Sequence, residues 1–336
     1  MRMTVLAGGN GGARFVRGLR HLVEADGSDS EITVIGNTGD DIWVHGVKVC
    51  PDLDTVMYTL GGGLSEERGW GREGETFTVK EELAQYGVEP TWFGLGDKDL
   101  ATHLVRTQSL ASGYTLTEVT AALCEHWQPR VRLLPMSDDR VETHVVIDST
   151  DGAVDSAGRP LRVAIHFQEW WIRYGAQPPA HEFVLVGVDS ARPGPQVLEA
   201  ITSADVVILP PSNPVVSIGT ILAVPGIADA VRATPAPVVG VSPIVGGAPL
   251  RGMADACLAA IGVETTAQAV GLNYGSRQRG GLIDGWLVDS RDADALPALA
   301  SAGISARAVP AIMSSVEEAA AIAAAALELA GLALKP

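Results

Sequence analysis

The sequence has little of what membrane proteins and disulfide-rich secreted proteins need. It contains no run of roughly 18 apolar residues, and its first residues lead straight into glycines, so we predict neither a membrane-spanning helix nor a signal peptide. The three cysteines, Cys50, Cys124 and Cys257, are odd in number and far apart. This spacing excludes a disulfide framework and a C-x-x-C zinc site. We therefore expect a cytoplasmic protein.

Basic residues are also scarce. The chain has 24 Lys and Arg against 40 Asp and Glu, a formal net charge of -16. Such a chain is poorly suited to nonspecific binding of nucleic acid or of anionic membranes. If it handles phosphates, backbone N–H groups, a few basic side chains and a divalent cation must offset their charge locally. The length of 336 residues fits one large α/β domain, or one with an inserted subdomain.

The beginning of the chain has a strand–helix–strand pattern. Residues 4–7 predict a buried strand, glycines follow at 8–12, a helix is expected over 13–23, and 32–35 predict a second, parallel strand. Continuous apolar runs later in the chain are typical of a sheet covered on both faces. The further strands are predicted at 92–93, 145–147, 163–167, 183–188, 206–209, 238–241 and 287–288.

The sequence divides into a core and an insertion. Residues 132–189 are rich in predicted strands and are expected to form a separate lobe. The core then consists of residues 1–131 and 190–336. Near the C-terminus, Ser314 and Ser315 before Glu317 and Glu318 predict a capping box for an alanine-rich helix that stops at Gly331.

The glycine-rich loop is the first candidate site. A strand, four glycines within five residues and then a helix direct backbone N–H groups at an anion, which makes Gly9, Asn10, Gly11 and Gly12 candidate phosphate-binding residues. The loop departs from the dinucleotide fingerprint G-x-G-x-x-G because Arg14 stands at the third glycine position. The alternative is a tight turn that serves close packing.

Four carboxylates follow the second strand within fifteen residues: Asp40, Asp41, Asp52 and Asp54. In open α/β sheets this end of a strand faces the ligand crevice. Carboxylates on such loops could hold Mg²⁺ against substrate phosphates. The alternative is that Asp52 or Asp54 caps a helix beginning near Thr55.

Polar groups follow two other predicted strands. Lys98 comes after the strand at 92–93 and could meet a phosphate or lie on the surface. Ser212, Asn213 and Ser217 follow the strand at 206–209 and could bind phosphate or ribose, or cap the next helix.

The predicted lobe carries its own candidates. His144 and His166 are possible acid–base groups, although a lone histidine is more often structural. The adjacent Trp170 and Trp171 could stack a flat ring system, or pack a lobe interface.

These motifs, in this order, resemble the 2-phospho-L-lactate transferase family (CofD/FbiA), and the resemblance runs from Met3 to about Gly331. The segments that carry it are GGNGGARF (8–15), NTGDD (37–41), CPDLDT (50–55), GDKDL (96–100) and PSNP (211–214). The stretches WQP (127–129) and EWW (169–171) are most similar to the actinobacterial branch.

The resemblance implies a Rossmann-like nucleotide-binding core and a Mg²⁺-dependent reaction of coenzyme F-420 biosynthesis. A guanosine-diphosphate donor carries phosphoenolpyruvate or 2-phospholactate. The acceptor is the terminal ribityl hydroxyl of 7,8-didemethyl-8-hydroxy-5-deazariboflavin, which attacks the distal phosphorus while GMP leaves. The resemblance also implies a homodimer. The sequence leaves the choice between the two donors open, because they differ only by one reduced double bond.

The resemblance also implies residue roles. Asp40 would hold Mg²⁺, with Asp41, and Asp40 or Asp54 would accept the hydroxyl proton. The glycine loop and the serine-containing loop would bind the nucleotide, through Gly9, Asn10, Gly11, Gly12, Ser212, Asn213 and Ser217. The inserted lobe would contribute to the acceptor site, and the expected acceptor contacts are Asp54, Lys98, His144 and Trp170.

Two other functions compete with this one. CofD-like regulators that bind UDP-sugars share the glycine loop without catalysis, but the run PDLD (51–54) argues against a pure binding role. An NAD(P)-dependent dehydrogenase is disfavoured by the broken fingerprint.

Overall fold

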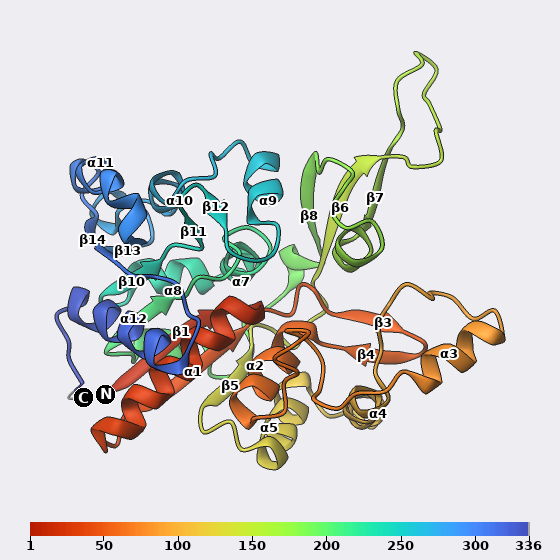
Figure 1. Cartoon of the computed structure of the whole chain (residues 1–336), viewed down its shortest axis with the longest axis horizontal. Coiled ribbons are helices and arrows are strands. Elements are labelled where there is room, and N and C mark those ends of the chain that lie inside the picture. The colour runs from red at the N-terminus through yellow and green to blue at the C-terminus, as the bar shows by residue number, and fades with distance from the viewer. Residues whose placement is uncertain (335–336) are drawn as a thin grey trace.

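A computed structural model gives the structure of residues 1–334, and a seven-stranded sheet forms its centre (Figure 1). The strand order is β14-β13-β10-β9-β1-β2-β5, and every neighbouring pair is parallel. This confirms the predicted α/β class. The seven strands are β1 Arg2–Ala7, β2 Glu31–Gly36, β5 Arg132–Pro135, β9 Val206–Leu209, β10 Val238–Val241, β13 Gly285–Asp289 and β14 Ser305–Val309.

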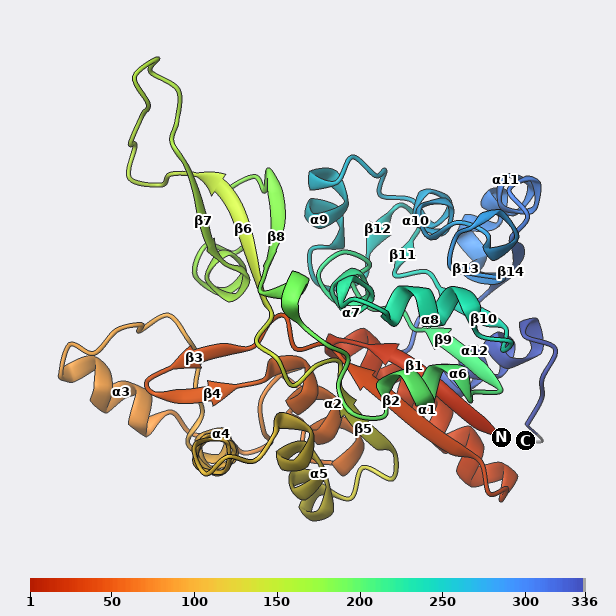
Figure 2. The same cartoon turned by 180° about the vertical axis from the view of Figure 1, so that it is seen from behind.

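Helices cover both faces of the sheet (Figures 1 and 2). Successive side chains of a strand point to opposite faces, so Val5 packs in one helical layer and Leu6 in the other. The first layer contains α1 Gly9–Asp26, α2 Pro51–Gly61, α5 Leu116–Trp127 and α12 Val316–Leu329. The second contains α6 Val197–Thr202, α7 Ile218–Ala223, α8 Ile227–Ala233, α9 Ala254–Ala260, α10 Ala267–Tyr274 and α11 Leu296–Ser301.

The two ends of the chain pack together through α1 and α12. A Cβ atom on Gly18 would lie 2.3 Å from the carbonyl carbon of Ala319, so only glycine allows the two helices to approach this closely. The predicted capping box is confirmed, since Ser315 and Glu318 form it reciprocally at the start of α12.

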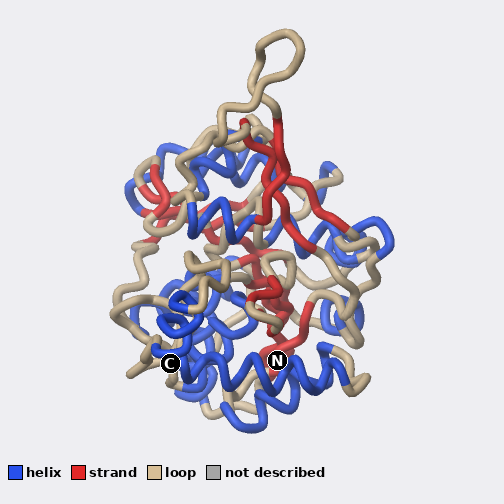
Figure 3. The backbone as a smooth tube through the Cα atoms, turned by 90° about the vertical axis from the view of Figure 1, so that its right-hand side faces the viewer, coloured by secondary structure: helices blue, strands red, loops and turns tan. Residues whose placement is uncertain are grey.

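The strand-rich lobe is a three-stranded antiparallel sheet, and its β6–β7 loop extends beyond the rest of the molecule (Figure 3). β6 (Glu142–Asp148) lies between β7 (Arg162–His166) and β8 (Glu182–Val186), and a π-helical turn at Glu169–Arg173 follows β7. Residues 132–135 fall inside the range assigned to this lobe by sequence, but they form β5 and pair with β2 of the central sheet.

The structure has a second projection from the core, which the sequence did not predict. The hairpin of β3 (Ile42–Val44) and β4 (Val47–Val49) packs with α4 (Asp97–Ala111), and α3 (Thr78–Gln85) lies beyond it (Figure 1). The strand predicted at residues 92–93 is wrong, because this segment is a loop between α3 and α4 that buries Phe93 against the hairpin. The remaining elements are short: β11 Ile244–Val245, β12 Ala248–Pro249, and 3-10 turns at Val188–Ser190, Arg277–Arg279 and Ser290–Ala295.

The topology brings three of the predicted motifs to one edge. The strand order reverses next to β1, with β2 and β5 on one side and β9 and β10 on the other. The loops that follow β1, β2 and β9 therefore meet at the carboxyl edge of the sheet, where open α/β folds bind their ligands. In the part of the chain that the structure describes, no helix has the length and apolar character needed to cross a membrane.

Candidate functional site

The glycine-rich loop leads directly from β1 into α1. Gly9, the first residue of the helix, has a φ of +62°, a left-handed conformation that favours glycine. The first-turn N–H groups of an α-helix have no acceptor within the helix and can serve a ligand. A Cβ atom on Gly11 would lie 2.2 Å from the carbonyl oxygen of Pro211, so the loop after β9 lies directly against the glycines.

Both serines predicted to bind the nucleotide lie on this loop. The Ser212 hydroxyl oxygen accepts the N–H of Gly8 at 3.2 Å and donates to its carbonyl oxygen at 2.8 Å. Ser217 is equally near, because a Cβ atom on Gly8 would lie 2.7 Å from the Ser217 Cβ. The structure therefore brings the two segments together across the switch point.

The two asparagines of the predicted nucleotide site hold loops in place. Asn213 accepts the N–H groups of Val215 and Val216 at 2.9 and 3.2 Å, which orders its own loop. The Asn10 amide donates to the carbonyl oxygen of Gly69 at 2.5 Å and fastens the loop after α2 over the glycines. Both amides thus position the site.

A pair of buried carboxylates, Asp40 and Asp52, lies beside the glycines; with Asn37 they form what we call the glycine-side cluster. Asp52 accepts the Asn37 amide at 2.9 Å and the N–H of Gly9. Asp40 is only 6% exposed, and its Oδ1 is buried without a hydrogen-bond partner among the described residues. Within residues 1–334, no lysine, arginine or histidine forms an ion pair with either carboxylate.

The electrostatics of this pair are set by burial and by the mutual repulsion of the carboxylates. Burial, and then the charge of Asp52, raises the pKa of Asp40 well above its ordinary value. Burial likewise raises the pKa of Asp52, although the Asn37 amide opposes the shift. Two carboxylates without a counter-ion, set against N–H groups suited to phosphate, are a donor set that Mg²⁺ would satisfy.

Asp41, the other predicted metal ligand, already forms an ion pair with the Lys48 side chain. Its Oδ2 lies 3.1 Å from the Lys48 Nζ and accepts the Cys50 thiol at 3.1 Å. Its backbone oxygen lies 3.1 Å from Nε2 of His166. Because Nδ1 of His166 accepts the N–H of Gln168, its Nε2 carries the proton and donates to Asp41. Burial lowers the pKa of His166 to about 4, so the neutral ring fastens the strand-rich lobe to Asp41.

The carboxylate of Asp54 belongs to a second group, the α4-side cluster of Asp54, Asp99, His103, Arg106 and Tyr58. Arg106, 1% exposed, donates to Asp54 and lies 3.1 Å from Nδ1 of His103. The Nε2 of His103 lies 3.4 Å from the Asp99 carboxylate, which also accepts the Tyr58 hydroxyl at 2.6 Å. Burial alone would raise the pKa of Asp99, but the hydrogen bonds from His103 and Tyr58 hold it below its ordinary value.

Asp54, Asp99 and His103 offer atoms within 4.8 Å of one another, as metal ligands do, but the Arg106 guanidinium already forms an ion pair with Asp54. The sequence reasoning missed it. The signal was the spacing of Asp99, His103 and Arg106, which places three polar side chains on one face of α4.

Asp52 and Asp54 serve different clusters because they lie two residues apart on one helix, and such residues do not face each other. The alternative that either caps a helix near Thr55 is wrong, since α2 begins at Pro51 and contains both.

The other residues predicted to contact the acceptor do not form one group in the structure. Lys98 is exposed and donates to the carbonyl oxygen of Glu73 at 2.8 Å. His144 is part-buried, 3.4 Å from Glu142 and against the ring of His166. Trp170 requires a correction: it is 0% exposed, in an apolar cluster that joins the strand-rich lobe to Met253 and Cys257, so neither face of its ring is open for stacking. The alternative, packing at a lobe interface, is confirmed.

Basic side chains gather at the rim of the glycine loop. Arg14 and Arg17 both lie near Glu66, at 3.6 and 2.5 Å. Burial, and then the charge of Arg251, lowers the pKa of Arg14, which means that two guanidinium groups are close together with only one partly exposed carboxylate between them. In a chain of net charge -16, this rim is suited to an anion.

These features define a doubly wound α/β protein with a glycine-rich loop and a carboxylate pair at its switch point. The chain belongs to the CofD family: its residues 3–319 match the family described as "2-phospho-L-lactate transferase CofD". It is therefore a transferase of the CofD type.

Proteins with similar sequences are named as transferases, and a solved structure has the same fold. A "Phosphoenolpyruvate transferase" of Thermobifida fusca is 62% identical over 334 residues, with 98% of each chain covered. One of Mycolicibacterium smegmatis is 57% identical over 340 residues, covering 99% of this chain and 100% of that protein. A crystal structure of a Bacillus halodurans protein of the upf0052 family shares the fold, with a TM-score of 0.59 at 20% identity, over 97% of this chain and 99% of that one.

Proposed function

We propose that the chain transfers a phosphoenolpyruvyl group from a guanosine-diphosphate donor to the ribityl hydroxyl of 7,8-didemethyl-8-hydroxy-5-deazariboflavin, with release of GMP, in coenzyme F-420 biosynthesis. The observation that carries the proposal is the uncompensated pair of Asp40 and Asp52 set on a phosphate-binding loop. The names of the relatives favour the phosphoenolpyruvyl over the 2-phospholactyl donor. We also propose, from the family resemblance, a cytoplasmic homodimer.

The chain's own groups would bind and orient the donor. The first-turn N–H groups of α1 face the crevice, and the loop of Ser212 and Ser217 closes on them. Arg14 and Arg251 add positive charge at the rim. Displacement at a phosphorus requires charge neutralisation and alignment more than covalent catalysis, and these groups provide both.

Mg²⁺ would be held by Asp40 and Asp52. This replaces Asp41 of the sequence prediction, because Lys48 and Cys50 already engage the Asp41 carboxylate. When bound, the ion supplies charge neutralisation for the diphosphate.

In the reaction, the ribityl oxygen forms a bond to the distal phosphorus and the bond from that phosphorus to the GMP oxygen breaks. The hydroxyl proton passes to Asp40, whose Oδ1 has no hydrogen-bond partner among the described residues. Asp54, the other predicted base, is paired with Arg106 and acts as a positioning residue.

The test is a reaction of the purified protein with Mg²⁺, the deazaflavin alcohol and the phosphoenolpyruvyl donor, followed by mass spectrometry. We expect GMP and a phosphoenolpyruvyl-deazaflavin product that both disappear with EDTA, and competition with the 2-phospholactyl donor then measures donor preference. If folded protein forms no product from either donor and instead binds a UDP-sugar tightly, the alternative of a non-catalytic regulator replaces this proposal.

A further inference from the structure

The turn that carries Asp40 follows β2 and belongs to no helix or strand. Inside it, the Asn37 side chain accepts the N–H of Gly39 at 2.9 Å, and the N–H of Asp41 donates to the carbonyl oxygen of Thr38 at 3.3 Å. Loop backbone is more mobile than the elements that it connects. The position of Asp40 therefore depends on bonds from outside the turn.

The strand-rich lobe supplies two such bonds, one on each side of Asp40. The N–H of Thr143, in β6, donates to the carbonyl oxygen of Gly39 at 2.7 Å. The Nε2 of His166, the last residue of β7, donates to the carbonyl oxygen of Asp41 at 3.1 Å. The two bonds fix the peptide unit that enters Asp40 and the one that follows Asp41, and so limit backbone rotation between them.

The turn continues the lobe sheet at the point where β7 ends. The pairing of β6 with β7 ends at His144 and His166, and one residue earlier in the chain the N–H of Thr143 meets Gly39 instead of β7. Thr143 is 0% exposed, so this bond is sheltered from water. A Cβ atom on Gly39 would lie 2.8 Å from the Thr143 Oγ1, so only glycine lets the turn lie this near to β6.

Both nitrogens of the His166 ring are engaged. Nδ1 accepts the N–H of Gln168 at 3.1 Å, which leaves the proton on Nε2 for the bond to Asp41. The His144 ring lies edge-on against the His166 ring, with 5.5 Å between the ring centres. Because neither nitrogen is free to exchange a proton with a substrate, the His166 ring serves orientation and not acid–base chemistry.

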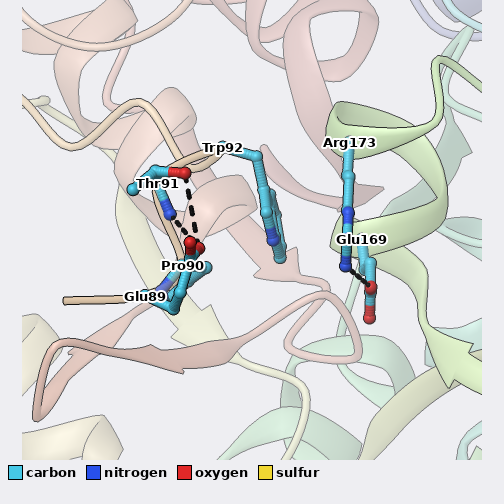
Figure 4. A pocket seen from close by; sticks show the side chains of 6 residues that line it. All are labelled: Glu89, Pro90, Thr91, Trp92, Glu169 and Arg173. Atoms are coloured by element: carbon cyan, nitrogen blue, oxygen red, sulfur yellow. Dashed lines mark hydrogen bonds and ion pairs between the residues drawn. The ribbon is translucent and has the colours of Figure 1, made fainter. Parts of the chain in front are cut away.

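Farther along the chain from His166, the lobe faces the loop between α3 and α4 across a cavity of about 690 Å³ (Figure 4). In each wall of this cavity the charged side chains bond within their own segment, Arg173 to Glu169 and Thr91 to Glu89. By contrast, the bonds of Thr143 and His166 cross from the lobe to the Asp40 turn.

Apolar packing holds the lobe in place independently of His166. Phe167 and Trp170 are 6% and 0% exposed and pack with Val216, Met253 and Cys257. Aromatic side chains bury a large apolar area, so they dominate contacts of this kind. Removal of the hydrogen bond from His166 should therefore leave the lobe docked and act on the turn alone.

We propose that His166 is a positioning residue for the transfer reaction and that, together with the Thr143 N–H, it holds the Asp40 turn against the strand-rich lobe. Groups that orient a metal-ligating carboxylate are commonly worth about 10- to 100-fold in metal affinity or activity. This inference rests on the proposed function, in which Asp40 is the proton acceptor and a ligand of Mg²⁺. It gives the inserted lobe a role that needs no contact with either substrate.

The experiment compares His166→Phe with His166→Gln. Phenylalanine keeps a ring but cannot donate, whereas the glutamine amide places an N–H near the original Nε2. Neither variant has a nitrogen at the Nδ1 position, so Gln168 loses its acceptor in both, and the comparison isolates the bond to Asp41. His181→Phe is the matched control, because His181 lies in the same lobe and its Nε2 is bonded to Asp148 at 2.9 Å.

Four quantities are measured for each variant: kcat, the KM for the deazaflavin alcohol, the Kd for Mg²⁺ alone by calorimetry, and the hydrogen exchange of the amides of residues 39–42. We expect His166→Phe to lower kcat and to raise the Mg²⁺ Kd, each at least about tenfold, while KM stays within about twofold of wild type. Exchange at residues 39–42 should become faster. His166→Gln should restore kcat and the Mg²⁺ Kd to within about threefold of wild type, and His181→Phe should change none of the four.

Wild-type kcat and Mg²⁺ affinity in His166→Phe would overturn the assignment. An equal loss in His166→Gln would overturn it too, because the ring and not its hydrogen bond would then matter. If His166→Phe folds poorly, His166→Leu, which also lacks a donor, takes its place. The metal and exchange measurements need no substrate, so they separate this inference from the reaction. A wild type that makes no product, but whose turn exchanges faster and binds Mg²⁺ more weakly in His166→Phe, would refute the proposed function and leave this role of His166 intact.

Discussion

Two buried acidic clusters flank α2, and they differ in whether a basic side chain pairs with their carboxylates. In the α4-side cluster, Arg106 lies against Asp54 inside the protein. In the glycine-side cluster, Asp40 and Asp52 accept hydrogen bonds from neutral donors such as the Asn37 amide and have no basic partner among residues 1–334. A buried charge is costly unless it is paired. Asp54 therefore has a counter-ion within the fold, whereas no ion pair to Asp40 or Asp52 is found among residues 1–334.

The direction of the pKa shifts expresses the same difference. Burial raises the pKa of Asp40, and the neighbouring Asp52 raises it further. Asp99 in the other cluster is also largely buried, but His103 and Tyr58 lower its pKa. A perturbed carboxylate with a basic partner is a structural feature, and one without a basic partner at the carboxyl edge of a sheet is the better functional candidate.

The largest effect is expected from Asp40→Asn. This change removes the proposed proton acceptor and one metal ligand, so kcat should fall by about three orders of magnitude while the fold is retained. Steady-state GMP release together with circular dichroism measures both. Turnover near the wild-type rate would remove Asp40 from the mechanism.

Asp54→Asn should act mainly on stability. It leaves the Arg106 guanidinium buried without its counter-ion and should lower the free energy of unfolding by about 3 kcal/mol. Urea denaturation in Mg²⁺-free buffer measures this effect. Asp40→Asn is the matched control, because there the loss of a repelled carboxylate should leave stability unchanged or higher. Equal losses of unfolding free energy in the two variants would show that the two clusters do not differ in charge compensation.

Much of this arrangement could be predicted from the sequence. Apolar runs such as residues 206–209 identify the parallel strands, and glycines after β1 predict the anion-binding turn. The rule that ligands bind at the carboxyl ends of strands then brings the loops of Asp40 and Ser212 together. The strands and the meeting of the loops are confirmed because they depend on local pattern and on topology, whereas anion binding stays a prediction.

What could not be predicted depends on side-chain partners distant in sequence. The pairing of Asp54 with Arg106 spans 52 residues, and the anchoring of Asp41 by His166 spans 125. Spacing alone treats Asp41 and Asp52 alike, but Lys48 neutralises the first and not the second. For the same reason Trp170, an aromatic beside polar groups in sequence, proved to be a core residue.

Asn37→Ala tests the neutral donors of the glycine-side cluster. The Asn37 amide donates to Asp52 and to the carbonyl oxygen of Val216, and its oxygen accepts the N–H of Gly39. Losing these buried bonds should lower the free energy of unfolding by about 2 kcal/mol. The exposed Asn273→Ala should change it by less than about 0.5 kcal/mol, and equal effects in urea denaturation would refute this role for Asn37.

The smallest effect is a pH dependence that Mg²⁺ should reverse. Because the pKa values of Asp40 and Asp52 are raised, the folded protein holds protons at pH values where the unfolded chain has released them. The stability that these protons contribute is present below the unfolded pKa of about 4 and is lost as pH rises through the folded pKa. Metal-free protein should therefore lose on the order of 1 kcal/mol between about pH 5 and pH 8.

Mg²⁺ competes with those protons, so its stabilising effect should be larger at pH 8 than at pH 5. Thermal unfolding of the wild type and of Asp40→Asn, with EDTA or with Mg²⁺ at both pH values, measures this difference. In Asp40→Asn both the pH-dependent loss and the Mg²⁺ effect should shrink, because only one carboxylate of the pair remains. A Mg²⁺ shift of the same size at both pH values, unchanged by the substitution, would mean that the cation binds elsewhere and that the glycine-side cluster is neutralised by protons alone.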